Sequence, residues 1–331
     1  MAEHNRLSTR RSVLSQAAAG AAVIAGGAAS AQPAPAARER GPLVWMNMDQ
    51  KELDDSYDQA VYAPNRDIVI KRCIRNSELA RERLGAPKRF SYGPTSFEGL
   101  DVFTAKTPDA PIMIYIHGGS WRVGTASQYH YLAEAFLNAG ANIAIPDFAN
   151  VGDVGGSLLV MADQIRRSVA WVYNNAKSFG GDPERIYVSG QSSGGHWIGV
   201  LMTTDWEKNY GVPMTIIKGG ASGSGMYDLK PARLSKRSEF VKFTDETEEK
   251  LSAQRHIDKL VAPIALVYGS LETPDFQRQS RDFFTAVKAA GKPVTLDVME
   301  GYNHFEVMES IGNPLSLFGR AAIEIMKRRP A

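Results

Sequence analysis

The sequence is poor in the residues that build disulfide bridges and metal sites. Its 331 residues include one cysteine and six histidines. Because Cys73 is alone, an internal disulfide and a CxxC redox or zinc site are both excluded. The histidines are scattered and form no HExxH motif, so we expect no metal site.

Nucleotide-binding glycine motifs are also missing. The glycine clusters at residues 152–156 and 219–225 match neither GxGxxG between a strand and a helix nor GxxxxGK. We interpret both clusters as turns, and we expect no cofactor.

The chain has no large excess of charge of one sign. Lysine and arginine total 38 and aspartate and glutamate 36, for a net charge of +2, and no basic stripe is interleaved with aromatic residues. A nucleic-acid partner is therefore not expected. The hydrophobic content of 44% is typical of a globular chain of one large or two small domains. The expected partner is a small-molecule substrate, and the sequence indicates no oligomeric state.

No apolar run is long enough to span a membrane stably. The longest candidate, residues 17–29, is shorter than the roughly 20 residues of a transmembrane helix, and prolines follow at 33 and 35. Before it stands Thr9-Arg10-Arg11-Ser12-Val13-Leu14, a twin-arginine pattern, and after it Ala29-Ser30-Ala31, which resembles a cleavage site. We predict a twin-arginine signal at 1–31, a linker at 32–42 and a periplasmic or secreted protein. The alternative is a disordered alanine-rich extension.

The rest of the chain alternates between strand and helix patterns. Residues 111–116 are a short apolar run, typical of a strand covered on both faces, whereas between 158 and 179 apolar residues recur every three or four positions, as in an amphipathic helix. Further strands are predicted at 141–145, 185–189, 213–218, 263–268 and 293–299, with helices at 128–139, 193–202 and 275–290. The pattern predicts an α/β fold with a mostly parallel sheet and helices on both faces. Residues 43–90 are interpreted as an N-terminal helical arm or cap, and 91–331 as the α/β domain.

The candidate nucleophile lies between a predicted strand and a predicted helix, in Gly190-Gln-Ser-Ser-Gly194. A Gly-x-Ser-x-Gly motif in that context is typical of a nucleophile elbow, in which the serine hydroxyl stands above the end of the sheet. We therefore predict Ser192 as the nucleophile.

A serine nucleophile needs a base and an orienting acid, which follow it in the order acid, then histidine, in sheets with this elbow. Of the histidines after Ser192, His196 lies in the elbow helix and His256 lies before a strand begins. His304 follows the strand at 293–299 and is our candidate base, in a loop.

Two carboxylates follow the strand at 263–268 and both qualify by position as the acid. We favour Glu272, because Asp275 follows Pro274 and is typical of the first turn of a helix. Asp275 stays the alternative acid, and Asp228 is a more distant third candidate.

The loop after the first long strand reads His117-Gly-Gly-Ser-Trp121. Backbone N–H groups of Gly118 and Gly119, with that of Ser193, are the candidate oxyanion hole. The alternative is a simple Gly-Gly turn. Trp121 and His117 are possible substrate-pocket residues, although core packing fits them equally well.

With these residues in view, the chain resembles the α/β-hydrolase fold, and within it the arylformamidase (kynurenine formamidase) group and related bacterial esterases. The resemblance depends on the His117 to Trp121 loop, the elbow, Tyr227-Asp-Leu-Lys-Pro231, Thr273-Pro-Asp-Phe-Gln-Arg-Gln-Ser280 and Asn303-His-Phe-Glu-Val307. It implies Ser192 as nucleophile, Glu272 as acid and His304 as base. The chain departs from the family where glutamate replaces the usual aspartate acid and where the elbow does not read Gly-His-Ser-Ala-Gly.

The expected function is that of a cofactor-independent serine hydrolase that cleaves a small carboxylic ester or an aryl amide through an acyl-enzyme on Ser192. An ester is favoured because an exported enzyme has little access to N-formylkynurenine. An arylformamidase or acyl-anilide amidase is the first alternative, and a non-catalytic binding protein with the hydrolase fold is the second.

Overall fold

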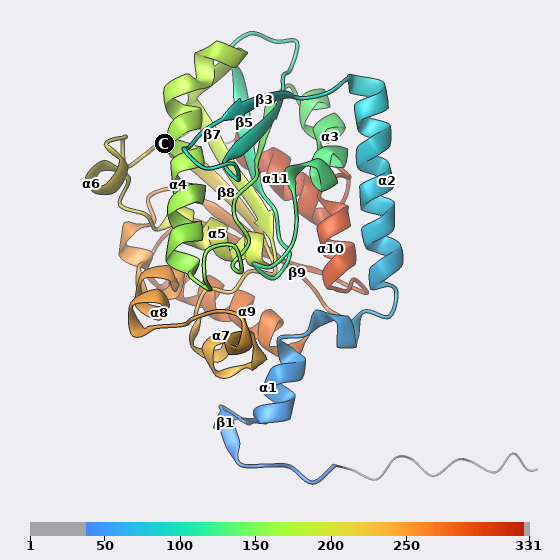
Figure 1. The fold of residues 1–331 in the computed structure, drawn as a ribbon, viewed down its shortest axis with the longest axis vertical. Helices are drawn as coiled ribbons and strands as arrows, with labels where there is room; N and C mark the ends of the chain where they lie inside the picture. The colour runs from blue at the N-terminus through green and yellow to red at the C-terminus, as the bar shows by residue number, and fades with distance from the viewer. Residues whose placement is uncertain (1–37, 328–331) are drawn as a thin grey trace, which may run out of the picture. The chain divides into compact units, whose positions relative to one another are not determined.

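An eight-stranded sheet forms the centre of the protein (Figure 1), whose computed structural model describes residues 38–327. The strand order is β10-β9-β8-β7-β5-β6-β4-β3, and the six strands from β10 to β6 are parallel. At the other end β4 and β3 run antiparallel. The strands are β3 (Lys88–Ser91), β4 (Gly99–Phe103), β5 (Ala110–Ile116), β6 (Asn142–Pro146), β7 (Gly181–Gln191), β8 (Ile217–Gly223), β9 (Ile264–Gly269) and β10 (Val294–Met299).

Helices cover both faces of this sheet, which confirms the expected α/β fold class. The helices α4, α5 and α9 pack on one face, and α2, α3, α10 and α11 pack on the other. The α-helices are α1 (Gln50–Ser56), α2 (Arg66–Leu84), α3 (Ala133–Asn138), α4 (Leu158–Asn175), α5 (Ser193–Met202), α6 (Trp206–Tyr210), α7 (Lys230–Leu234), α8 (Asp245–Leu251), α9 (Pro274–Ala289), α10 (His304–Ser310) and α11 (Leu317–Lys327). Short 3-10 helices are η1 (Gln59–Tyr62), η2 (Ala126–Leu132), η3 (Ala176–Phe179), η4 (Lys236–Glu239), η5 (Ala253–Arg255) and η6 (Ile257–Lys259).

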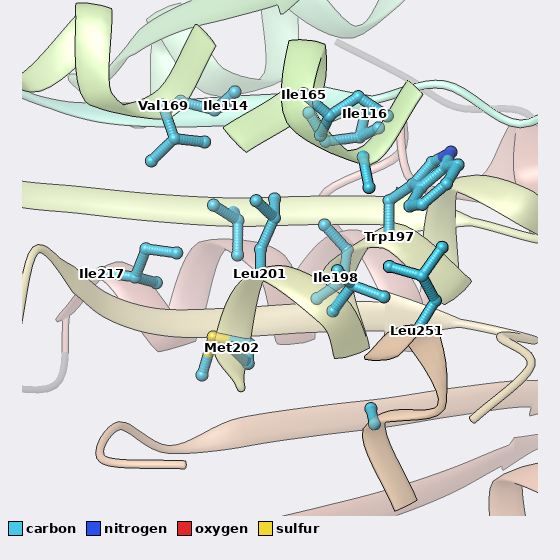
Figure 2. Close-up of a cluster of buried hydrophobic side chains, with 14 of the residues drawn as sticks. Ile114, Ile116, Ile165, Val169, Trp197, Ile198, Leu201, Met202, Ile217 and Leu251 are labelled. Carbon is cyan, nitrogen blue, oxygen red and sulfur yellow. The ribbon is translucent and has the colours of Figure 1, made fainter. Parts of the chain in front are cut away.

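The strand β5 shows why the central strands are apolar throughout. Its alternate residues point to opposite faces, so Ile114 and Ile116 pack against α4 and α5, while Tyr115 packs in the cluster on the other face. Figure 2 shows the cluster that contains Ile114 and Ile116, in which side chains from β5, α4 and α5 pack together on one face of the sheet. Ile114 and Ile116 are fully removed from water, and each contributes roughly 1.5–3 kcal/mol to stability.

The strand order places two loops together. From β5 the chain passes to β6 on one side and then crosses back to β7 on the other side of β5. The loops that follow β5 and β7 therefore diverge from neighbouring strands at the carboxyl edge, which is where α/β sheets bind ligands.

The glycine cluster at 219–225 corrects our interpretation of it as a turn. Its first five residues belong to β8. A Cβ on Gly219 would lie 2.6 Å from Cγ1 of Ile325, and a Cβ on Gly220 3.0 Å from the Met202 sulfur. Glycine is present because helices press on the strand from both faces, and this need overrides its low strand propensity.

The N-terminal segment contributes to the sheet as well as to helices. It contains a two-stranded sheet of β1 (Leu43–Trp45) and β2 (Met48–Asp49), then α1, η1 and α2. The strand β3 spans the expected boundary at 90/91 and pairs with β4. Within residues 38–327, no helix combines the length and apolarity that crossing a membrane requires. The predicted signal at residues 1–31 lies outside the described residues.

Candidate active site

Ser192 lies in a strained turn between β7 and α5. Its backbone has φ 61° and ψ −124°, in the left-handed half of conformational space, where a non-glycine residue costs roughly 1–3 kcal/mol. Two backbone hydrogen bonds hold the turn: the Ser192 N–H donates to the Gly223 carbonyl at 2.9 Å, and the His196 N–H donates to the Ser192 carbonyl at 2.9 Å. The turn directs the Ser192 hydroxyl toward the carboxyl edge of the sheet.

Glycine is required where the elbow meets the loop after β5. A Cβ on Gly194 would collide with the Ile116 carbonyl, and a Cβ on Gly118 would lie 2.7 Å from the Gln191 carbonyl oxygen. The two backbones can approach this closely only without side chains.

Ser192, His304 and Glu272 form one hydrogen-bonded chain. The Nε2 of His304 lies 2.7 Å from the Ser192 Oγ, and its Nδ1 lies 3.0 Å from Oε2 of Glu272. All three side chains are buried. Oε1 of Glu272 accepts from the Ser224 hydroxyl at 2.5 Å and from the Gly269 N–H at 2.9 Å. A carboxylate held by three donors can keep the imidazole in one orientation.

His304 differs in one respect from our expectation of a loop residue. It is the first residue of α10, directly after Asn303, which caps that helix. Its carbonyl accepts from the Gln191 side-chain amide at 2.9 Å. The helix start and this bond fix the backbone of His304, so the ring is placed by regular structure.

The remaining candidates for acid and base, Asp275, Asp228 and His256, form hydrogen bonds outside the chain that joins Ser192, His304 and Glu272. Asp275 accepts from the Tyr57 hydroxyl at 2.8 Å and from Arg278 Nε at 2.7 Å. Asp228 accepts from a local backbone N–H, and Nε2 of His256 lies 2.7 Å from the Glu249 carbonyl oxygen. Of the two carboxylates that follow β9, the structure brings Glu272 to His304.

The loop after β5 is tied to the elbow helix. Gly119, Ser120 and Trp121 all have positive φ, and the Trp121 N–H donates to the Ser193 hydroxyl at 3.3 Å. Ser193 is the first residue of α5, so its N–H has no acceptor within the helix. No acceptor for the Gly119 N–H lies in the described part of the chain either. Two unpaired N–H donors beside the Ser192 turn could receive an oxyanion.

Trp121 and His117 do not line the cavity at this site, so of the two roles left open by the sequence, substrate pocket and core packing, the structure supports core packing. The Trp121 indole donates to Nδ1 of His196 at 3.3 Å, and Nε2 of His196 donates to the Leu251 carbonyl at 3.0 Å. Burial lowers the pKa of His196 to about 3, so this ring is neutral and can accept from the indole. The ring of His117 stacks on Phe148 with a centroid separation of 4.3 Å, and burial lowers its pKa. Both side chains are packed inside the protein.

A cavity of about 540 Å³ opens beside Ser192 and His304. The N-terminal segment supplies one wall of it, and the loop after β5 supplies another. Its lining includes Tyr57, Asp58, Gln59, Ala60, Arg66, Asp67, Ile70, Cys73, Ile74, Gly119, Ser120, Arg122, Val123, Gly124, Gln128, Tyr129, Gln191, Phe305, Met308 and Arg237. The volume suits a small substrate.

Three contributors to the site escaped the sequence analysis. Ser224 holds Glu272, Tyr57 holds Asp275, and Arg237 lines the cavity. Ser224 stands in the glycine cluster that we interpreted as a turn, so recognition of β8 would have placed it at a strand end. No local pattern marks Tyr57 or Arg237. Across residues 38–327 no three histidine, cysteine or acidic side chains are grouped as metal ligands.

The chain is similar to hydrolases in sequence and in structure. Residues 100–222 match the family model BD-FAE. Kynurenine formamidase of Danio rerio is 28% identical over 280 residues, covering 81% of this chain and 93% of that protein. Isoprenylcysteine alpha-carbonyl methylesterase ICME of Arabidopsis thaliana is 25% identical over 239 residues, covering 65% of this chain and 56% of that protein. A crystal structure from Silicibacter sp. tm1040 has a TM-score of 0.72 at 23% identity, covering 82% of this chain and 98% of the other.

These similarities confirm the expected fold and the expected resemblance. The chain has an α/β-hydrolase fold and is an enzyme of the hydrolase class that resembles the arylformamidases and their esterase relatives.

Proposed function

We propose that this α/β-hydrolase-fold enzyme is a serine hydrolase that cleaves a small carboxylic ester or aryl amide through an acyl-enzyme on Ser192. The observation that supports it most is the chain of hydrogen bonds from the Ser192 Oγ through His304 to Glu272, with contacts of 2.7 and 3.0 Å. At the Ser192 end, these hydrogen bonds reach a cavity that is large enough for a small substrate.

In the acylation half of the proposed reaction, the Ser192 Oγ attacks the substrate carbonyl carbon while Nε2 of His304 takes the hydroxyl proton. Glu272 stabilises the resulting imidazolium. The carbonyl oxygen becomes an oxyanion and accepts hydrogen bonds from the N–H groups of the Gly118-Gly119 loop and of Ser193. Collapse of the tetrahedral intermediate breaks the bond to the leaving group, which departs with the proton from His304.

Deacylation repeats the same steps with water as the nucleophile. His304 takes a proton from a water molecule, whose oxygen attacks the acyl carbonyl of Ser192. The ester bond to Ser192 then breaks, the serine oxygen recovers the proton, and a carboxylic acid leaves. Each half therefore begins and ends with neutral His304.

The bond that is cleaved is an ester in our first proposal and an aryl formamide in our second. Support for the aryl formamide comes from the 28% identity to kynurenine formamidase over 81% of the chain. The first is supported by the methylesterase relative and by the export pattern in the sequence. A panel of aryl esters, aryl formamides and acyl anilides, assayed under one condition, separates the two by kcat/KM.

The mechanism is tested by Ser192→Ala. We expect a loss of kcat of about 10⁴-fold or more for every cleaved member of the panel, with substrate binding retained. A variant that keeps wild-type activity would refute Ser192 as nucleophile. Reaction with a fluorophosphonate, followed by intact mass, tests the non-catalytic alternative, which predicts no adduct on Ser192.

We further propose that residues 1–31 direct twin-arginine export and are removed. The proposal is supported by the Arg10-Arg11 pair and the Ala29-Ser30-Ala31 site in the sequence. N-terminal sequencing of the protein from the periplasm should begin near Gln32, and an N-terminus at Met1 in that fraction would contradict removal.

A further inference from the structure

The charged side chains that line the cavity do not balance. Asp58 is 2.8 Å from Lys236, and Asp67 is 2.9 Å from Arg66, so both carboxylates already have a cationic partner. Arg122 and Arg237 also line the cavity, and neither forms an ion pair with a carboxylate anywhere in residues 38–327. Three arginines and two aspartates therefore line the cavity, and two of the arginines have no carboxylate partner among the described residues.

Arg237 is the more unusual of the two because it is only 3% exposed. Its Nη2 donates to the Tyr57 carbonyl at 3.2 Å, whereas Nε and Nη1, which carry three of the five N–H donors, have no acceptor in the described chain. Desolvation lowers the pKa of Arg237 to about 10, so the group still carries its charge at neutral pH. A buried charge without an ion-pair partner is costly, and burial of this kind calls for an anion.

Aromatic rings fix the guanidinium close to the catalytic residues. The Arg237 Cζ lies 5.1 Å from the centre of the Trp121 ring and 6.0 Å from that of Phe276. Phe276 in turn contacts the His304 ring edge to face, with centroids 5.2 Å apart. Arg237 and the proposed base thus have Phe276 as a common neighbour, and both line the same cavity. Arg122, which stacks on Phe240 at 4.5 Å, adds a second cation at the same wall.

We propose that the substrate carries a carboxylate and that Arg237, with Arg122, receives it in the cavity. The inference depends on the proposed function, since it names the substrate class for that site. A guanidinium binds a carboxylate with directed, charge-assisted hydrogen bonds. A singly charged carboxylate fits better than a dianionic phosphate, because the three arginines and two aspartates of the lining leave a net charge of +1.

The test compares neutral and carboxylate-bearing substrates of matched size. One arm places the charge in the acyl group, with 4-nitrophenyl butyrate against the 4-nitrophenyl half-ester of succinate. The other arm places it in the leaving group, with phenyl acetate against 3-carboxyphenyl acetate. In the wild type we expect kcat/KM to favour the charged member by about 10-fold or more in one arm, and that arm shows which half of the substrate carries the carboxylate.

Variants assign the preference to a residue. In Arg237→Met, the ratio of kcat/KM for the charged substrate to kcat/KM for the neutral one should fall by about 10- to 100-fold. In Arg237→Lys part of this ratio should be retained, because lysine keeps the positive charge but lacks the planar guanidinium that binds a carboxylate through two hydrogen bonds. The matched control is Arg166→Met. Arg166 is also desolvated, with a lowered pKa, but it binds the Thr204 hydroxyl and lies outside the cavity lining. The ratio in this control should equal that of the wild type.

A binding measurement on the wild-type protein tests the proposal even if the Arg237 variants fail to fold. Titration calorimetry with benzoate and benzamide should show tighter binding of benzoate by about 10-fold, reduced by added salt. Equal affinity for the two, a neutral preference in both substrate arms, or a charged preference that survives in folded Arg237→Met would each overturn the proposal. If no ester or amide is cleaved at all, the proposed function fails, and the calorimetry still decides the carboxylate site.

Discussion

Glu272 and Asp275 are three residues apart and both are buried, yet they contact different parts of the molecule. Glu272 lies in the turn after β9 and reaches Nδ1 of His304, whereas Asp275 lies in the first turn of α9 and pairs with Arg278. One helical turn is enough to aim the two side chains at different partners. The preference for Glu272 in the sequence came from the proline before Asp275, which is typical of a helix start.

We predict that Glu272→Gln lowers kcat by about 10²- to 10⁴-fold, because an amide cannot stabilise the imidazolium of His304 and favours the wrong tautomer. Asp275→Asn should leave kcat within a few-fold of wild type and lower the free energy of unfolding by about 1–3 kcal/mol, since its buried partners lose a charged acceptor. Steady-state kinetics and urea unfolding measure both. The reverse pattern would make Asp275 the acid.

His196 should make stability depend on pH. Its pKa in the folded protein is about 3, against an ordinary value of about 6.5. Between these values the unfolded chain binds a proton that the folded chain excludes, so this contribution is complete above pH 6.5 and is lost as the pH falls toward 3, by up to about 1.4 kcal/mol per pH unit. The free energy of unfolding should therefore fall more steeply with acid in wild type than in His196→Gln.

Glutamine is the matched replacement because its carbonyl can accept from Trp121 and its amide can donate to the Leu251 carbonyl. Urea unfolding at a series of pH values gives the two slopes. Between pH 4 and 6 the slopes of the free energy of unfolding against pH should differ by the equivalent of about one bound proton, which is about 1.4 kcal/mol per pH unit. Above pH 7.5 the two slopes should coincide. Identical slopes throughout would show that His196 titrates normally in the folded protein.

At the scale of elements, the site is built where two strand-end loops touch. The loop after β5 rests on the elbow between β7 and α5, and the Trp121 N–H joins it to Ser193. The sequence predicted both loops, because in each case a glycine-containing stretch directly follows an apolar run that is typical of a strand. The extent of β8 was not predictable in this way, since its glycines are there to admit side chains from α5 and α11 that are remote in sequence.

Gly118→Ala tests this contact. The new Cβ would lie 2.7 Å from the Gln191 carbonyl oxygen, so the loop must move away from the elbow and its N–H donors with it. We expect kcat to fall by about 100-fold or more, with a smaller change in KM. The control is Gly140→Ala, where φ is +78° and the Cβ would meet nothing within 4 Å. That variant should lose about 1–2 kcal/mol of stability and keep kcat.

At the scale of the whole described chain, polar contacts between residues far apart in sequence join the N-terminal segment to α9 and to the loop before it. The Tyr57 hydroxyl donates to Asp275 and accepts from the Gln279 amide at 3.1 Å, and the Gln59 amide donates to the Thr273 hydroxyl at 3.0 Å. Burial and the neighbouring Asp275 raise the pKa of Tyr57 well above its ordinary range, so the hydroxyl stays a donor. The segment that walls the cavity thus meets α9 directly after Glu272.

Tyr57→Phe should lower the free energy of unfolding by about 1–3 kcal/mol, because Asp275 loses a buried donor. The cavity wall should loosen with it, so KM should rise more than kcat falls. Tyr62→Phe is the control, since Tyr62 is 41% exposed and its change should cost less than about 0.5 kcal/mol. Chemical unfolding and steady-state kinetics report both effects, and equal stability of the two variants would contradict the role given to Tyr57.

The sequence by itself determined what short stretches encode: the alternation that builds a parallel sheet, the elbow around Ser192, the order Ser192, Glu272, His304, and the glycine loop after β5. These features were predictable because each one depends on residues close together in sequence: the spacing of apolar residues in strands and helices, and the glycines where two backbones pack closely. Tertiary structure alone decided the partners of Asp275, the packing of Trp121 and His117 away from the cavity, and the buried charge of Arg237. These depend on which distant segments meet, and a side chain's contacts, burial and pKa exist only once they have met.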